Sequence, residues 1–242
     1  MNDKDIKVEL DALAIQHNTP ELFYRDPIAL PKRYRTLQDI EISALITSVI
    51  SWGKRDMIFA NANKIDKMMG SSPYEFIMSR DWESLEGSRV NIHRTFFESD
   101  LFIICSALHY YYLNNQSLED LFLDGITQGI DKLSEMIGSK HISSTRRGGP
   151  AKRTNMMLRW LVRNDGIVDI GVWKRVSPSQ LIIPLDTHVS KRARQYWSDL
   201  PKTDRLATAL KITEKLRELS PEDPCKYDFA LFGEGFQNGA AK

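Results

Sequence analysis

Apolar residues recur at helical spacing through most of this chain, and that spacing limits the fold more than any other feature of the sequence. Apolar side chains three or four positions apart share one face of a helix, and that face must be buried against another element. The best strand pattern, Leu181-Ile182-Ile183, is short. The sequence therefore predicts an all-α fold built from about ten helices.

Capping residues, Gly and Pro set the expected ends of these helices. The segment from Asp39 to Trp52 is strongly apolar, so we expect a central buried helix there. Asp39, Asp56 and Asp186 are the expected N-caps of the helices that they open. The other expected helices lie at residues 8–17, 56–69, 100–114, 129–137, 152–164, 186–196, 204–219 and 223–232.

Composition and length exclude several classes of protein. The 242 residues allow one large domain or two small lobes. The longest apolar runs, such as 101–105, are far shorter than the roughly 18 residues that span a bilayer. The charged N-terminus is no signal peptide, so we expect a cytoplasmic protein without membrane contact. Cys105 and Cys225 lie beside apolar or aromatic residues, so we expect buried thiols, with a disulfide as the alternative that a reducing compartment disfavours. Two cysteines cannot hold a four-cysteine iron–sulfur cluster.

Positive charge is concentrated in one stretch of a nearly balanced chain. The net charge is +1, yet the residues between Met136 and Asn164 include seven Lys or Arg and no Asp or Glu. A localised basic face favours phosphate recognition, because each neutralised phosphate releases counterions. The alternative is a solvated face with no ligand. The seven residues are Lys140, Arg146, Arg147, Lys152, Arg153, Arg159 and Arg163.

Two short segments carry the residues best suited to chemistry. The first, Gly148-Gly149-Pro150-Ala151-Lys152-Arg153, indicates a tight basic turn that opens a helix, where glycine amides can approach a phosphate closely. The second, Pro184-Leu185-Asp186-Thr187-His188-Val189, is an apolar run whose aspartate opens the next helix. A nucleophilic lysine and a fixed, ionised aspartate are the groups needed to cut an N-glycosidic bond and trap the sugar.

Each of these residues also has a plainer explanation. The first segment can be an ordinary loop between helices, and Asp186 can be an N-cap and nothing more. A lone histidine such as His188 is more often a structural residue than a catalyst. Capping and catalysis are compatible, because a capped carboxylate is rigid and ionised. The spacing of His, Cys, Asp and Glu fits no zinc site, and no dinucleotide or phosphate-loop motif is present.

The two segments resemble the helix-hairpin-helix DNA glycosylase superfamily, which includes endonuclease III and the 8-oxoguanine glycosylases. There a Gly-x-Gly-x-Lys hairpin precedes a helix, an apolar stretch and an aspartate that opens the next helix. Gly148, Lys152 and residues 184–189 match these positions. The turn at residues 51–55 resembles the turn after an early helix of these enzymes, and residues 226–233 resemble the C-terminal helix of the 8-oxoguanine branch.

The likeness covers about residues 39–235 and has two departures from the pattern. Pro150 replaces the second hairpin glycine. The spacing from Lys152 to Asp186 is longer than in endonuclease III, although an archaeal 8-oxoguanine branch has a similar extension. The chain also resembles an uncharacterised bacterial family of similar length, which implies no activity.

The superfamily resemblance implies a two-lobed helical unit over residues 1–242, with lobes at roughly 39–125 and 126–200 and the termini packing back. It implies a monomeric base-excision DNA glycosylase with AP lyase activity on double-stranded DNA, directed at oxidised purines, with no metal, cofactor or iron–sulfur cluster. Lys152 would attack the sugar C1′, and Asp186 would take its proton or stabilise the cationic transition state. Asp228 and Phe232, one helical turn apart, would line the base pocket. The implied DNA contacts are Trp52, Lys54, Arg55, Arg146, Arg147, Gly148, Gly149, Arg153, His188 and Lys191.

Two other functions fit the same residues. The chain could be a non-catalytic protein of the same fold that binds DNA structures, or an all-α partner-binding protein whose basic stretch is only a solvated face. Individual roles stay open too. Trp52 is expected either to wedge into the duplex or to be part of the core. Asp228 and Phe232 either line the base pocket, or Asp228 is a surface residue and Phe232 a core residue.

Overall fold

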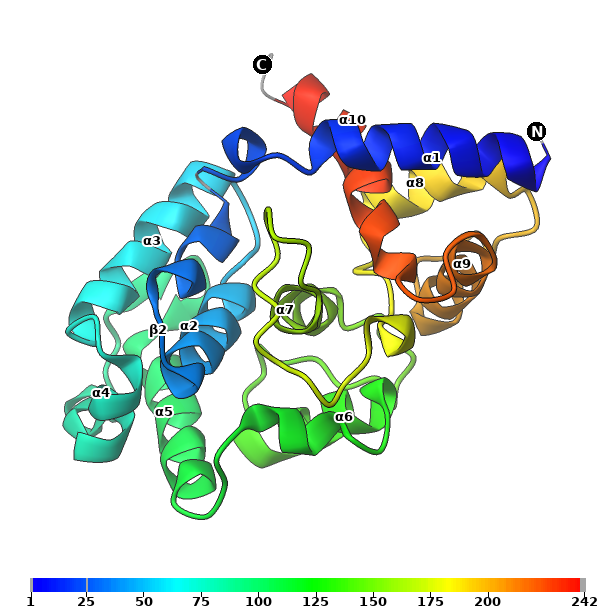
Figure 1. Cartoon of the computed structure of the whole chain (residues 1–242). Helices are drawn as coiled ribbons and strands as arrows, with labels where there is room; N and C mark the ends of the chain where they lie inside the picture. Colours follow the sequence, from blue (N-terminus) through cyan, green and yellow to red (C-terminus); the bar gives the residue numbers. More distant parts are fainter. Residues whose placement is uncertain (1, 25, 240–242) are drawn as a thin grey trace. The chain divides into compact units, whose positions relative to one another are not determined.

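Ten α-helices dominate the part of the chain that the computed structural model describes, residues 2–24 and 26–239 (Figure 1). The prediction of an all-α chain is confirmed at this level. The chain divides into two compact units. We call residues 23–144 the middle unit, and residues 1–22 with 145–242, which include both ends of the chain, the terminal unit.

The middle unit is built around α2, the helix expected to be central and buried. Every residue of α2 from Ile40 to Val49 is buried, including Glu41, whose carboxylate accepts hydrogen bonds from Tyr112 Oη at 2.8 Å and from the backbone N–H of Leu118 at 3.1 Å. The elements of this unit are α2 (Leu37–Val49), α3 (Arg55–Met68), α4 (Pro73–Ser79), the antiparallel pair β1 (Asn91–His93) and β2 (Phe96–Phe97), α5 (Glu98–Tyr112) and α6 (Ile126–Ile137).

The terminal unit joins the first helix to residues 145–242. Helix α1 packs along α10, and α10 packs on α8 (Figure 1). The helices of this unit are α1 (Asp3–His17), α7 (Lys152–Val162), α8 (Thr187–Tyr196), α9 (Leu206–Leu219) and α10 (Asp228–Gly239).

Short 3₁₀ segments occur in both units, at Pro20–Phe23, Pro27–Ala29, Pro31–Arg33, Asp81–Leu85, Leu118–Phe122, Pro178–Gln180 and Pro224–Tyr227.

The chain passes between the two units at residues 22/23 and 144/145. The lobe boundary at 125/126 stays an expectation from the resemblance. Helix α6 belongs to the middle unit because its apolar face packs there. A Cβ on Gly129 would lie 2.2 Å from the ring of Phe122, so only glycine permits this close approach. Ile130 and Leu133 beside it are fully buried.

Several predicted ends of helices are wrong by a few residues. Helix α2 begins after Thr36, and Asp39 instead accepts a hydrogen bond from the backbone N–H of Tyr74 at 2.8 Å. Helix α3 begins after Lys54, so Asp56 lies in its first turn and does not cap it. Asp186 alone of the three proposed caps has that role.

Residues 181–183, the best strand pattern in the sequence, form no strand. The side chains of this segment are buried, but the backbone N–H of Ile183 donates to Thr213 Oγ1 at 3.0 Å and joins no sheet.

Both cysteines are buried free thiols, and burial raises their pKa values. In the described part of the chain, every helix is too short or too polar to cross a bilayer.

Candidate active site

Lys152 and Asp186 come together in the terminal unit. Lys152 is the first residue of α7 and Asp186 precedes α8, and Lys152 Nζ lies 3.7 Å from Asp186 Oδ2. This distance is an ion pair but exceeds hydrogen-bond length, so the amine is not locked to the carboxylate. The side chains are 32% and 21% exposed, which leaves both accessible to a ligand.

The other carboxylate oxygen of Asp186 fixes the start of α8. Oδ1 accepts the backbone N–H groups of His188 and Val189, each at 2.9 Å. Such a cap stabilises a helix by about 1 kcal/mol and holds the carboxylate in one orientation. Asp186 therefore has one oxygen committed to the backbone and one directed at the lysine.

The turn before α7 is tight, as its glycines suggested, but it is built differently from the prediction. Gly148 has φ +74° and its N–H donates to Thr145 O at 2.7 Å. Pro150 lies before the helix, outside its first turn, and Ala151 is the N-cap in a left-handed conformation with φ +45°. The side chain of Asn155 donates to Pro150 O at 2.9 Å and so ties the turn to the helix.

The start of α9 holds the same turn from its other side. Arg205 Nη2 donates to Arg147 O at 2.7 Å, and the N–H of Leu206 donates to Gly148 O at 2.9 Å. The side chain of Arg147 is exposed, as are those of Arg146 in the turn and Lys191 on α8. Arg153, on the first turn of α7, is half-buried, and burial lowers its pKa.

Helix α10 places the two predicted base-pocket residues near Asp186. The ring of Phe232 meets the ring of His188 edge to face, with centroids 6.4 Å apart. Asp228 is buried and forms an ion pair with Arg159, so the alternative of a surface residue is wrong for Asp228. Burial raises its pKa, and the charge of Asp186 adds to the rise, whereas Arg159 and Lys152 oppose it.

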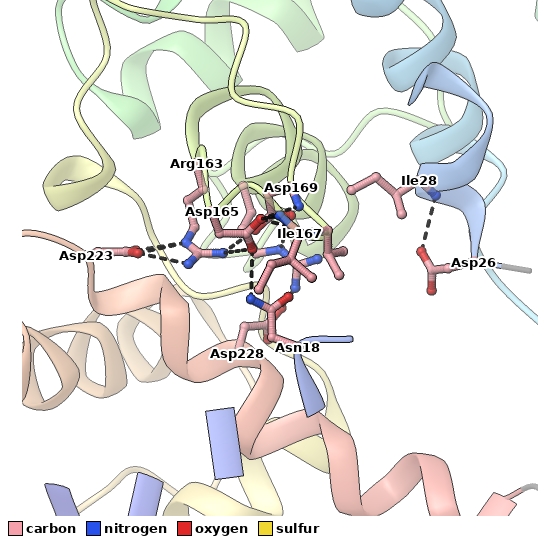
Figure 2. A network of polar contacts seen from close by, with 11 residues as sticks. Asn18, Asp26, Ile28, Arg163, Asp165, Ile167, Asp169, Asp223 and Asp228 are labelled. Carbon is pink, nitrogen blue, oxygen red and sulfur yellow. Dashed lines mark hydrogen bonds and ion pairs between the residues drawn. The ribbon is translucent and has the colours of Figure 1, made fainter. Parts of the chain in front are cut away.

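Two arginines of the basic stretch are buried and cannot reach a phosphate. Arg159 and Arg163 share the buried carboxylate of Asp169, and Arg163 also pairs with Asp223 at 2.9 Å (Figure 2). Both guanidiniums lie over the ring of Phe229, with Cζ at 4.6 and 5.4 Å from its centroid. The expectation of one continuous basic face is therefore wrong for these two.

Lys140 is not part of one continuous basic face either. It lies in the middle unit, where Nζ pairs with Asp100 at 3.1 Å. The basic stretch of the sequence therefore contributes residues to both units. In the terminal unit Arg159 and Arg163 are buried in ion pairs, and the exposed cations are Arg146 and Arg147 of the turn before α7.

The turn that follows α2 lies in the middle unit, where Trp52 is half-buried. Its ring stacks on His141 with centroids 5.6 Å apart and an interplanar angle of 17°, and it meets His93 edge-on at 4.9 Å. Lys54 is exposed, and Arg55 pairs with Asp26 at 3.1 Å. These contacts favour a packing role for Trp52 over insertion into a duplex.

A family model described as a protein of unknown function, DUF2400, matches residues 26–237. The chain belongs to the DUF2400 family. No curated protein and no solved structure matches it. The matched range of this DUF2400 chain includes Lys152, Asp186 and Asp228, so the candidate site lies inside the family's shared region.

Sequence reasoning missed the acidic partners of Arg159 and Arg163 in this DUF2400 protein. A signal was present, because Arg159 and Arg163 are four residues apart in the otherwise apolar segment 156–163. An arginine on a buried helix needs a carboxylate nearby. Spacing alone could not say which carboxylates, since Asp223 and Asp228 come from much later in the chain. Among the described residues, no group of three or more His, Cys, Asp or Glu is placed to hold a metal ion.

Proposed function

We propose that this protein is a base-excision DNA glycosylase with AP lyase activity and has a helix-hairpin-helix glycosylase-like fold. The observation that carries the proposal is the ion pair of Lys152 and Asp186 at 3.7 Å, formed by the first residue of one helix and the N-cap of another. The two residues are also those that match the glycosylase pattern in the sequence.

The chemistry would begin with a proton transfer from Lys152 Nζ to the carboxylate of Asp186. The neutral amine then attacks C1′ of the nucleotide, which forms an N–C1′ bond and breaks the bond from C1′ to the base. The base leaves with the bonding electron pair and takes up a proton. The adduct nitrogen then loses a proton, the C1′–O4′ bond breaks and O4′ takes up a proton, which leaves a protonated imine. Loss of a proton from C2′ breaks the C3′–O bond and expels the 3′ phosphate.

The surroundings of the pair suit this reaction. In its alternative role Asp186 stays ionised while Lys152 gives its proton to water. The carboxylate, held in place by two backbone amides, then stabilises the positive charge that develops on the sugar. Phe232 and His188 supply flat rings on the side of α10, where an extruded base could stack. No cofactor is needed for any of these steps.

The test is a panel of duplexes that each carry one lesion: an abasic site, 8-oxoguanine or thymine glycol. The protein is mixed in excess with each duplex, and base release and strand cleavage are followed separately. We expect cleavage at the abasic site and base release from at least one damaged duplex. Absence of both reactions on every duplex, with DNA binding demonstrated, would refute the activity.

A non-catalytic protein of the same fold that binds DNA structures is the second candidate. One observation favours it: capping and ion pairing account for both oxygens of Asp186, and the pairing of Asp228 with Arg159 accounts for that carboxylate. This candidate predicts salt-dependent binding to branched or abasic duplexes without any cleavage.

A further inference from the structure

Arg94 lies at the tip of the β1–β2 hairpin in an unfavourable backbone conformation. Its φ is +53°, in the left-handed region that Gly, Asn and Asp adopt in two-residue hairpin turns. Arg94 and Thr95 form this turn, and the residues on either side of it, His93 and Phe96, pair across the two strands. A non-glycine residue stays in this region only where the surrounding structure holds it there.

The side chain of Arg94 lies over the turn that follows α2. A Cβ on Gly53 would lie 2.8 Å from Arg94 Nη1 and 3.3 Å from Cδ. Gly53 itself has φ +110°. The backbone conformation therefore requires glycine at this position, and a Cβ here would displace the Arg94 guanidinium.

His93 fixes the turn and the hairpin to each other. Its Nε2 lies 2.8 Å from Trp52 O, so this nitrogen carries the proton and donates it to that carbonyl. The other ring nitrogen, Nδ1, accepts from Asn61 Nδ2 at 2.9 Å, and His93 is 1% exposed. Residues 52–54 and 93–95 thus form one surface, which we call the loop pair.

The loop pair carries cations that the described part of the chain leaves without a carboxylate partner. Arg94 and Lys54 are exposed, and no ion pair joins either to a described residue. In contrast, the neighbouring Arg55 is neutralised by Asp26. Fixed, exposed and unpaired guanidinium and ammonium groups are complementary to phosphates, and guanidinium binds them through two parallel hydrogen bonds.

We propose that the loop pair binds the backbone phosphates of duplex DNA, with Arg94 as the contacting residue and Gly53 leaving room for its guanidinium. This inference rests on the proposed function for the identity of the partner. It assigns Trp52 the role of a support that holds the turn, and it names a contact residue that the sequence did not indicate.

The test compares Arg94→Gly with Arg80→Gly. Arg80 is a matched control, because it is an exposed arginine of the same unit with φ +66°, but its side chain pairs with Glu83, with Nε 2.8 Å from Oε1. Both variants relieve left-handed strain, so both should melt at or above the wild-type temperature. Binding of a short undamaged duplex is measured by fluorescence anisotropy over a range of salt concentrations.

We expect Arg94→Gly to weaken duplex binding about fivefold or more at low salt and to lower the slope of log K against log salt by about one, while Arg80→Gly binds as wild type. Gly53→Ala should also weaken binding, because its methyl group displaces the guanidinium. Equal duplex affinities of Arg94→Gly and Arg80→Gly, or a wild-type protein that binds no duplex, would overturn the inference.

The readouts separate this inference from the lyase proposal. Weaker binding by Arg94→Gly with no cleavage of any lesion supports the loop pair and refutes the activity. Cleavage of lesions with Arg94→Gly bound as tightly as wild type overturns the loop pair and leaves the activity standing.

Discussion

Lys152 Nζ lies 3.7 Å from Oδ2 of Asp186, while Oδ1 of the same carboxylate caps α8. One side chain thus has a structural and an electrostatic function, and each belongs to a different oxygen. Because the cap needs only an acceptor and the lysine needs a negative charge, a substitution that keeps the acceptor and removes the charge separates the two.

Asp186→Asn is that substitution. Asparagine caps a helix about as well as aspartate, so the melting temperature should fall little. The single-turnover rate of base release should fall at least about a hundredfold, because the fixed charge that stabilises the cationic transition state is lost. Thermal denaturation and rapid-quench kinetics on the same preparation measure the two effects. Unchanged release by a stable variant would leave Asp186 with capping alone.

The elements that the sequence located best are those whose information is local. The periodicity of α2 and the aspartate before α8 depend on neighbours a few positions away, and both were predicted correctly. The sequence misplaces the starts of α2 and α3 because Asp39, Asp56 and Asp186 all fit the pattern of an N-cap. Contacts with residues outside each helix determine which of the three is a cap.

The parts of the site that the sequence could not locate depend on contacts between distant residues. Arg159 looked like a phosphate ligand because its acidic partner Asp228 comes 69 residues later. The sequence does not indicate Arg94, because its backbone angle and its approach to Gly53 leave no pattern in the sequence.

The buried carboxyl of Asp169 should make stability depend on pH. Burial raises its pKa to about 6, with Arg159 and Arg163 opposing the rise. Its pKa in the unfolded chain is near ~3.9, so between about pH 4 and 6 the folded state binds more protons. This group therefore makes the free energy of unfolding fall as pH rises through that window.

Asp169→Asn removes this titration, although it also weakens the arginine pairs at every pH. Urea unfolding between pH 4 and 7 should give a slope of stability against pH that is more positive in the variant, by at most about 1.4 kcal/mol per pH unit. Asp223→Asn is the control, since it takes a partly exposed carboxylate from Arg163 instead. Parallel pH profiles for wild type and Asp169→Asn would contradict the prediction.

Asp228 is expected to read the damaged base. An aspartate can accept from the N7–H of 8-oxoguanine, a donor that guanine lacks, so 8-oxoguanine is the expected substrate. Asp228→Asn should slow 8-oxoguanine release by about tenfold or more relative to Asp223→Asn, which affects the same ion-pair network. Thymine glycol duplexes are assayed in parallel. Equal rates for the two variants, or no release from either lesion, would remove Asp228 from the pocket.

Trp52 is expected to support the loop pair by packing. Trp52→Phe keeps an aromatic ring but loses part of the stack on His141, so the melting temperature should fall by a few degrees. Affinity for an abasic duplex should stay within about twofold of wild type, because the cations of the turn remain. A wedge inserted into the duplex predicts the reverse, with weaker binding and little change in stability.

The central claim is that Lys152 forms a covalent bond with the sugar, and borohydride trapping tests it most directly. Lys152→Arg keeps the positive charge beside Asp186 and cannot form an imine. Lys215→Ala, on α9, controls for the loss of a lysine elsewhere in the same unit. With sodium borohydride and abasic duplex, we predict a covalent protein–DNA adduct for wild type and Lys215→Ala and none for folded Lys152→Arg. An adduct of wild-type yield with Lys152→Arg, or none with the wild-type protein, would contradict the account.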